Sequence, residues 1–425
     1  MNSRERVNIA LNHEEPDRVP VDFGGTLVTG INVSVVYYLR QALKLDKPGT
    51  PIKIIEPYQM LGEIDFDLME SLGIDCVGLN GRKNIFNIEN ENWKYWDGYH
   101  NIPVLVPEKF NIKPNNNGSI FMYPEGDEFV PPSGIMPNGG YYFDVIIRQP
   151  EISDDTLKVE DNLEEFGYIT DDDIDFFSKY AKRLFDNTDK AIIANFGGTS
   201  FGDIALIPAP QLKYPKGIRD VGEWYISLAK RKDFIIEIFK KQTEIALKNI
   251  AKIYKKIGNI ITVVFVSGTD FGTQRSPLIS IDTYRQLFKP FHQIINDWIH
   301  TNTKWKTFTH TCGAIEPLLA DFIEAGFDIL NPVQCSAYGM DPAELKRKYG
   351  RNIVFWGGGI DTQKTLPFGK EEEVSKEVIE RIKIFGKDGG FVFNAIHNIQ
   401  ANTPINNVLT MFETVKKYGK YPISY

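Results

Sequence analysis

The second half of the chain alternates short apolar runs with longer amphipathic stretches. The stretches with apolar residues at helical spacing include DFIIEIFKKQTEIALKNIAKIYKKIG (233–258), TYRQLFKPFHQIINDWIH (283–300) and EEEVSKEVIERIKIFG (371–386). The apolar runs are AIIANFGG (191–198), NIITVVFVSG (259–268), KWKTFTHTCG (304–313), FDILNPVQ (327–334), NIVFWGGG (352–359) and GGFVFNAIHN (389–398). Continuous apolar strands separated by amphipathic helices predict a parallel sheet that is buried on both faces.

Two further strands are predicted nearer the N-terminus. A short helix over 3–12 leads into VDFGG (21–25), and residues 67–80 predict a helix, a glycine stop and a buried strand. Eight strands with intervening helices predict a (β/α)8 TIM barrel, an α/β fold that can exceed about 400 residues as one domain. A doubly wound open sheet is the alternative.

The pattern changes between about residues 81 and 160. Aromatic-rich pieces such as NWKYWDGYHNIPVLVP alternate there with the turn signals NNNG, PEGD, PPSG and PNGG. Short extended runs between turns predict antiparallel strands. We therefore expect a single domain over 1–425 that carries an antiparallel β insertion at 81–160, in the N-terminal third of the chain.

Composition and charge exclude several classes of protein. The chain has 425 residues, 42% of them hydrophobic, and a net charge of −8 with scattered lysines, which disfavours a nucleic-acid-binding surface. The N-terminus lacks the apolar core of a signal peptide, and no run approaches the roughly 18 apolar residues of a membrane span. Three cysteines are too few for a disulfide framework. We expect a cytoplasmic protein with reduced thiols, and the sequence leaves a homodimer open.

The segment TFTHTCG (307–313) places His310 and Cys312 two positions apart at the end of an apolar run. Residues at i and i+2 of an extended segment point to the same side, so a thiol and an imidazole could reach one ion or one substrate. A buried core cysteine beside a hydrogen-bonded histidine is the structural alternative. Five successive strands, however, are followed by polar or glycine residues, and catalytic groups of a barrel lie at the carboxyl ends of its strands. These residues are Asp270, His310, Cys312, Gln334, Cys335, Gly357–Gly359 and His397.

A thiolate with two imidazoles is a competent ligand set for zinc, which favours tetrahedral nitrogen and sulfur ligation. The candidate ligands are His310, Cys312 and His397, with Cys335 or Asp270 as alternatives for the third position. Bound zinc would act as a Lewis acid. The same residues without metal could supply an acid/base histidine beside a spectator thiol.

Further residues are candidates for catalysis or substrate binding. We assign Asp270 and Gln334 as catalytic candidates, and Gln274, Gly358, Trp93 and Trp96 as substrate-binding candidates. The alternative roles are structural: turn and capping chemistry for Asp270, and close packing below the barrel mouth for the glycine run. The aromatic insertion either covers the rim of the barrel, where flat rings could contact a substrate, or packs on the barrel wall.

The order of motifs resembles that of the uroporphyrinogen decarboxylase superfamily, which includes the decarboxylase and cobalamin-dependent methyltransferases. The similar segments are RERVNIALNHEEPDRVPVDFG, FGTQRSPLIS, HTCGAIEPLL, FDILNPVQ, IVFWGGGIDT and GGFVFNAIHNIQANTPINNV. The decarboxylase carries an arginine-rich segment of the type RQAGRY near its N-terminus, and no such segment follows VDFGG here. A tetrapyrrole with many carboxylates would lack its counterions.

The methyltransferases of this superfamily bind zinc through an HxC pair and a distant cysteine near the last strand. His310 and Cys312 match the pair, and His397 stands where the distant cysteine is expected. The resemblance implies a methyltransferase that moves a methyl group from a small donor, such as a methoxylated aromatic or a methylamine-like compound, to a corrinoid (cobalamin) carried by a partner protein. The alternatives are a uroporphyrinogen decarboxylase-like lyase in tetrapyrrole biosynthesis and a non-catalytic corrinoid- or tetrapyrrole-binding protein.

Overall fold

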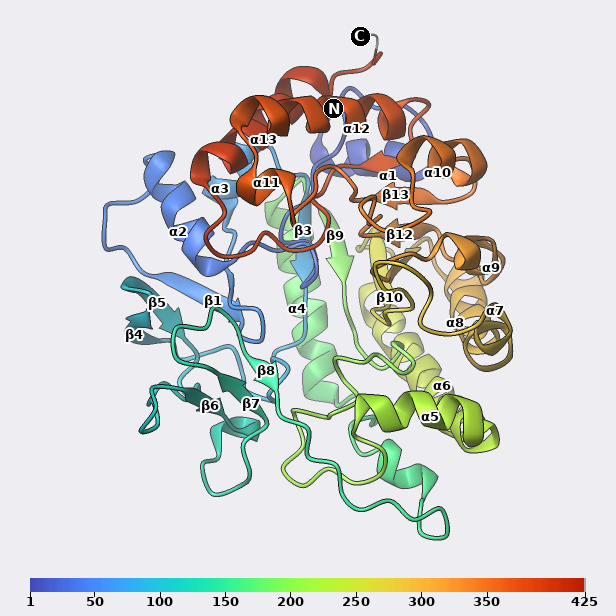
Figure 1. Cartoon of the computed structure of the whole chain (residues 1–425). Helices are drawn as coiled ribbons and strands as arrows, with labels where there is room; N and C mark the ends of the chain where they lie inside the picture. Colours follow the sequence, from blue (N-terminus) through green and yellow to red (C-terminus); the bar gives the residue numbers. More distant parts are fainter. Residues whose placement is uncertain (424–425) are drawn as a thin grey trace.

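The computed structural model describes residues 1–423 and centres on a curled sheet of seven parallel strands (Figure 1). Along the sheet the order is β14-β13-β12-β11-β10-β9-β3, with no reversal of the kind that a doubly wound sheet requires. The strands are β3 (Cys76–Leu79), β9 (Ala191–Ala194), β10 (Val263–Ser267), β11 (Lys306–His310), β12 (Ile329–Asn331), β13 (Val354–Trp356) and β14 (Phe391–Val392). Seven of the eight predicted strands are thereby confirmed.

The eighth predicted strand, around Val21, forms a single bridge instead of a regular strand. Val21 pairs in parallel with Phe393, just beyond β14, and its carbonyl accepts a hydrogen bond of 2.7 Å from the amide of Asp75, just before β3. Pro20 supplies no amide hydrogen, and Gly24 has a φ of +90°, so an extended ladder cannot continue on either side. The segment therefore lies between the two edge strands of the sheet, and we call this place the seam.

Helices surround the strands in the order that the alternating pattern predicts (Figure 1). They are α1 (Ser3–Leu11), α2 (Val33–Ala42), α3 (Phe66–Leu72), α4 (Asp171–Asn187), α5 (Val221–Lys230), α6 (Lys232–Ile257), α7 (Ile281–Thr283), α8 (Lys289–Asn302), α9 (Leu319–Glu324), α10 (Pro342–Tyr349), α11 (Thr365–Phe368), α12 (Glu371–Gly386) and α13 (Ile405–Tyr418). The helix expected over 283–300 is divided by a π-helical turn at Tyr284–Phe288. Pro290 near the start of α8 lacks the amide hydrogen that a continuous helix needs there, which favours the wider turn.

A closely packed apolar core fills the space enclosed by the sheet. It takes inward-facing residues from each of the seven strands, and the apolar side of α1 covers it at one end. These residues are Val7, Leu11, Cys76, Ala191, Ile193, Val263, Phe265, Phe308, Ile329, Val354, Trp356 and Val392. The interior is thus solid, and chemistry is confined to the loops at the strand ends.

Short strands before and within the predicted insertion form two small sheets beside the main one (Figure 1). They are β1 (Ile52–Glu56), β2 (Leu61–Gly62), β4 (Lys94–Tyr99), β5 (Ile102–Val106), β6 (Ile120–Met122), β7 (Gly134–Met136) and β8 (Asp144–Val145). Pairing is antiparallel for β4 with β5 and along β6-β7-β8, but β5 also pairs in parallel with β1. The range 81–160 therefore does not enclose both sheets, because β1 and β2 precede it.

Within residues 1–423, no helix is long and apolar enough to cross a membrane. The predicted single domain runs to residue 425, and its last two residues lie outside the part of the chain described.

Candidate metal centre

Three side chains with metal-binding atoms converge at the carboxyl ends of the strands. His310 is the last residue of β11, Cys312 follows it by two positions, and His397 lies in the loop after β14. One ligand atom from each residue lies within 4.8 Å of the others. They form the only such group of histidine, cysteine or carboxylate side chains within residues 1–423. We refer to His310, Cys312 and His397 as the ligand cluster.

His310 is fixed from both sides of its ring. It is 3% exposed, its Nδ1 lies 2.5 Å from Oδ1 of Asn331, and its Nε2 lies 3.5 Å from Sγ of Cys312. Burial lowers the pKa of His310 to about 4. The imidazole is therefore neutral at physiological pH, which is the form that binds a metal.

Cys312 is held by its backbone. Its amide donates a hydrogen bond of 2.7 Å to Oδ1 of Asp270, which follows β10. The next residue, Gly313, has a φ of +91°, and a Cβ there would lie 2.4 Å from the backbone of Gly272, so this tight turn requires glycine. Burial raises the pKa of the Cys312 thiol, and the Asp270 carboxylate adds to the rise. A bound cation would supply the countercharge that a thiolate needs at this position.

His397 has a strained backbone and a hydrogen-bonded ring. Its φ is +70°, and its Nδ1 accepts a hydrogen bond of 2.7 Å from the amide of Asn398. Burial lowers the pKa of His397 to about 3, and the neighbouring His310 contributes in the same direction. The side chain of Asn398 in turn accepts from the amide of Gly30 and donates to Oε1 of Gln59.

The donor set fits zinc. Zinc bonds of about 2.0–2.1 Å to nitrogen and 2.3 Å to sulfur place tetrahedral N and S ligands about 3.6 Å apart. The separation of His310 Nε2 and Cys312 Sγ, 3.5 Å, already matches that spacing. His397 matches in chemistry, but its hydrogen bond with the amide of Asn398 must break before zinc binds. If Nδ1 binds the ion, its lone pair is no longer available to Asn398. If Nε2 binds, a neutral ring carries its proton on Nδ1, which then cannot accept a hydrogen bond.

A cavity of about 390 Å³ opens beside the ligand cluster and exposes Cys312 and His397. Its other side chains are mainly amides and hydroxyls, with Ile396 as an apolar contribution. The amides come from Gln274, Gln334, Gln363, Asn398 and Gln400. The residues that line this cavity all belong to the described part of the chain. They include no lysine, arginine, aspartate or glutamate.

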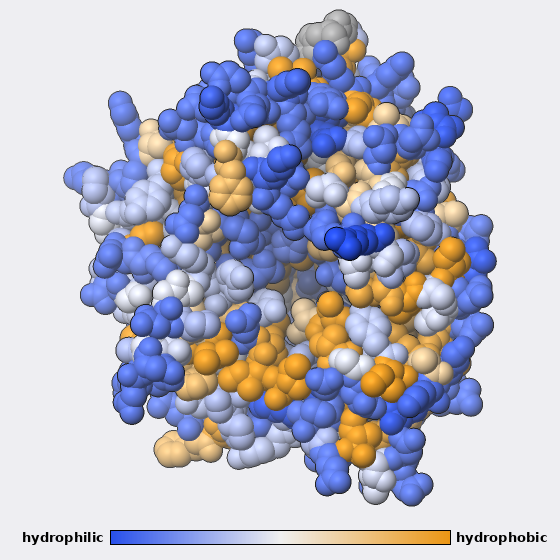
Figure 2. All heavy atoms as spheres, in the orientation of Figure 1, coloured by the Kyte–Doolittle hydropathy of each residue, from blue (hydrophilic) through white to orange (hydrophobic). Residues whose placement is uncertain are grey.

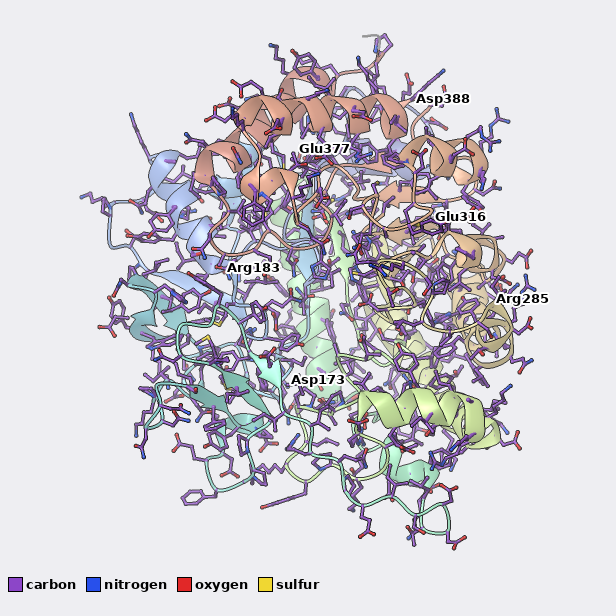
Figure 3. The ribbon with its side chains drawn as sticks, viewed as in Figure 1. Asp173, Arg183, Arg285, Glu316, Glu377 and Asp388 are labelled. Atoms are coloured by element: carbon purple, nitrogen blue, oxygen red, sulfur yellow. The ribbon has the colours of Figure 1, made fainter. Side chains whose placement is uncertain are left out.

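The face of the molecule seen in Figure 1 is hollowed near its middle, with apolar side chains along part of the border (Figure 2). Of the charged side chains labelled in Figure 3, Arg285 and Asp388 lie toward the outer edge of the same view, whereas Arg183, Glu377 and Asp173 lie closer to its middle.

Two of the predicted amide residues face this cavity. Oε1 of Gln334 accepts a hydrogen bond of 2.7 Å from the amide of Gly313, which fixes the orientation of the side chain and leaves its Nε2 as the donating end. Gln274 lies at the outer side and donates to Oε1 of Gln363 at 3.1 Å. Asp270 lies behind Cys312 and is not part of the lining.

Other predicted residues lie elsewhere. Sγ of Cys335 donates to the carbonyl of Val333 and lies outside the ligand cluster. Gly358 packs against Val333 and Cys335, with a φ of +69°, and does not line the cavity. Trp96 is 5% exposed and packs against Phe110, with 5.6 Å between ring centroids.

Trp93 lies near the amino group of Lys53 on β1, which is 5.6 Å from its ring centroid. Neither tryptophan lines the cavity. The geometry thus gives Trp96 a packing role in the small sheets.

Sequence reasoning missed two polar residues around the centre. Asn331 is the last residue of β12 and lies beside His310. Asp203 follows β9 and reaches the end of β10. There its Oδ2 lies 3.0 Å from the position that a Cβ on Gly268 would occupy. Burial raises the pKa of Asp203 to about 7, and the nearby Asp270 adds to the rise. The available signal was the same for both, a polar residue at or soon after the end of an apolar run.

Comparisons with known proteins agree with this architecture. Residues 219–418, which include the ligand cluster, match the protein family described as uroporphyrinogen decarboxylase (URO-D). Uroporphyrinogen decarboxylases from Coxiella burnetii strains are 27% identical over 89 residues, or 20% of this chain, and the match spans about a quarter (24%) of the length of those relatives.

The solved structure of a methyltransferase from Methanosarcina mazei aligns with a TM-score of 0.54 and 16% identity. The alignment covers 98% of this chain and 99% of the other. At this identity the likeness is one of fold.

Proposed function

Because the chain is a member of the uroporphyrinogen decarboxylase superfamily, we propose that it is a zinc-dependent methyltransferase of that superfamily. The methyl group moves from a small methylated donor, a methoxylated aromatic or methylamine-like compound, to a corrinoid carried by a partner protein. The observation that carries the proposal is the ligand cluster at the edge of a cavity without charged lining residues. The fold shared with the Methanosarcina mazei methyltransferase is consistent with it.

His310, Cys312 and His397 would hold the zinc ion, with Cys312 as the thiolate. Zinc in such a site supplies a Lewis acid that polarises a donor heteroatom. Asp270 fixes the backbone at Cys312 by accepting its amide hydrogen. The low pKa values of the two histidines keep both rings in the neutral form that coordinates a metal.

The cavity would orient the methyl donor. Nε2 of Gln334 is a fixed hydrogen-bond donor, because Gly313 holds the other end of the amide. We assign it to the heteroatom from which the methyl group leaves, where a hydrogen bond stabilises the negative charge that develops. The open side of the cavity leaves room for the partner protein, since methyl transfer requires the acceptor to approach in line.

The lyase alternative receives less support from the cavity. A porphyrinogen with several carboxylates needs cationic partners to bind, and guanidinium groups are the usual ones. The residues lining this cavity offer amides and hydroxyls instead. The composition of the lining therefore favours a small donor that carries few negative charges.

An anaerobic transfer assay tests the proposal. The zinc-loaded protein is incubated with a reduced corrinoid protein and a panel of methoxylated aromatics and methylamines, and the methylated corrinoid is followed by its visible absorbance. We expect methylation with at least one donor. Cys312→Ala should lose most of the zinc and at least about 100-fold in rate, because it removes the thiolate ligand.

Cys335→Ala is the matched control. This cysteine follows β12, near the same end of the sheet, but lies outside the ligand cluster, so zinc content and rate should stay within about twofold of the unmodified protein. Full activity in Cys312→Ala would contradict the ligand assignment. Decarboxylation of a porphyrinogen, without methylation by any donor, would favour the lyase.

A further inference from the structure

The side chain of Asn331 contacts residues on both neighbouring strands of the sheet. Asn331 is fully buried at the end of β12 and is the register partner of His310 on the neighbouring strand β11. Its Nδ2 donates a hydrogen bond of 2.7 Å to the carbonyl of Trp356, at the end of β13. Its Oδ1 lies 2.5 Å from Nδ1 of His310.

These contacts determine which nitrogen of His310 carries the proton. A backbone carbonyl can only accept, so the amide nitrogen of Asn331 must face Trp356 and the amide oxygen must face His310. The oxygen in turn can only accept, and Nδ1 of His310 must donate to it. In a neutral ring the lone pair then lies on Nε2, the nitrogen 3.5 Å from Sγ of Cys312.

We propose that Asn331 is a positioning residue that holds His310 as the Nδ1–H tautomer, with Nε2 directed at the metal position. The metal-binding part of this inference rests on the proposed function, and the tautomer part does not. Partners that accept the second ring hydrogen of a ligating histidine commonly change metal affinity by 10- to 100-fold. Here the partner is a neutral amide, which orients the ring without adding charge to the site.

The support behind Asn331 is rigid. The indole of Trp356 donates a hydrogen bond of 2.9 Å to Oδ2 of Asp22, and its ring packs against Phe308 with 5.6 Å between centroids. The carbonyl that orients Asn331 therefore has little freedom to move. His397 has the opposite arrangement, because its Nδ1 accepts a hydrogen bond. His310 is consequently the histidine that the metal-free protein already presents correctly.

Zinc affinity and ring protonation test this role in the full-length protein. Zinc is removed with a chelator, and its affinity is measured by competition with a chromogenic chelator for the unmodified protein and Asn331→Leu. We expect Asn331→Leu to bind zinc about 10- to 100-fold more weakly. Nitrogen-15 NMR of the metal-free protein should show Nδ1 of His310 protonated, and this preference should be lost in Asn331→Leu.

Asn296→Leu is the matched control. Asn296, on α8, is also fully buried and donates a hydrogen bond of 2.7 Å to the carbonyl of Ala325, outside the contacts of Asn331. Its loss should change zinc affinity less than threefold. Asn331→Asp retains an acceptor for Nδ1 of His310 and should restore the tautomer that Asn331→Leu loses.

Two results would overturn the proposal. One is a loss of affinity in Asn331→Leu no larger than in Asn296→Leu. The other is an unchanged Nδ1–H tautomer of His310 in metal-free Asn331→Leu. If the unmodified protein binds no zinc, the proposed function fails, and the NMR comparison alone decides whether Asn331 sets the tautomer.

Discussion

At the scale of single residues, Asp203 and Asp270 place two carboxylates near the ligand cluster without a salt bridge. No ion pair found within residues 1–423 includes either of them. Oδ1 of Asp203 accepts a hydrogen bond of 3.0 Å from the amide of Ala205, and Oδ1 of Asp270 accepts from Cys312. Burial raises the pKa of both groups. Their ionisation therefore opposes folding.

Asp203→Asn should change how stability depends on pH. The folded protein holds the proton of Asp203 up to about pH 7, whereas an unfolded chain releases it near pH 4. The stabilisation from this proton is complete below pH 4 and is lost as pH rises through 7. Relative to the unmodified protein, the free energy of unfolding of Asp203→Asn should rise by roughly 1 to 3 kcal/mol between pH 4 and pH 8.

Urea denaturation at pH 4, 6 and 8 measures this difference. Asp186→Asn, on the exposed side of α4, reports the effect of removing a surface carboxylate. A constant difference between Asp203→Asn and the unmodified protein across the pH range would show that Asp203 ionises as freely in the folded chain as in the unfolded one.

Local spacing was sufficient to predict the pair His310 and Cys312, because residues two apart on a strand share a side. It was not sufficient for Asn331, whose contact with His310 depends on the register of β11 against β12. Register is a property of the sheet, and no short segment encodes it. The hydrogen bond between Asn398 and His397 depends on a left-handed backbone at a non-glycine residue, which local propensity disfavours.

At the scale of elements, the glycine run after β13 allows two neighbouring loops to approach closely. Gly357 has a φ of +123°, and a Cβ there would lie 2.3 Å from the carbonyl oxygen of Pro332, in the loop after β12. Backbone in this region is accessible essentially to glycine alone. The run therefore allows the loops beside the centre to pack, which is the structural alternative considered for GGG.

Gly357→Ala should destabilise the protein by about 2 to 4 kcal/mol, because the added methyl group meets backbone atoms that cannot move aside easily. Guanidinium denaturation measures the change. Gly167→Ala is the matched control, since no atom lies within 4 Å of its added Cβ and its φ is not left-handed. Equal stability of the two variants would mean that the loop after β12 can shift to accept the methyl group.

Element type was predictable wherever burial was continuous, as in the parallel strands and the long helices α6 and α12. The division of the helix before α8 depended on one proline and its hydrogen bonds. The small sheets were harder to delimit, because β1 pairs with β5 across some fifty intervening residues. A pattern of turns predicts hairpins, but it does not identify a distant strand that joins them.

At the scale of the whole molecule, the ligand cluster takes its residues from two different places in the curled sheet. His310 ends β11, in the interior of the sheet, and Cys312 follows it, whereas His397 follows β14, the edge strand at the seam. Two strands, β12 and β13, lie between β11 and β14 in the order of the sheet. An ion bound by all three residues would therefore connect the interior of the sheet with its edge.

The single bridge at Val21 determines where the molecule should open first. Three backbone hydrogen bonds join the seam, from the amides of Asp22, Phe393 and Asp75, whereas β10 lies between two continuous parallel neighbours.

In heavy water, these three amides should exchange hydrogen for deuterium by local opening, at least about tenfold faster than the amides of β10 and β11. Zinc should slow exchange at Phe393, because His397 lies in the loop that follows. Equal exchange across the sheet would indicate that it opens only by global unfolding. The seam would then connect metal occupancy with local opening of the chain, and isotope exchange at this edge would report an ion that is also held by residues three strands into the sheet.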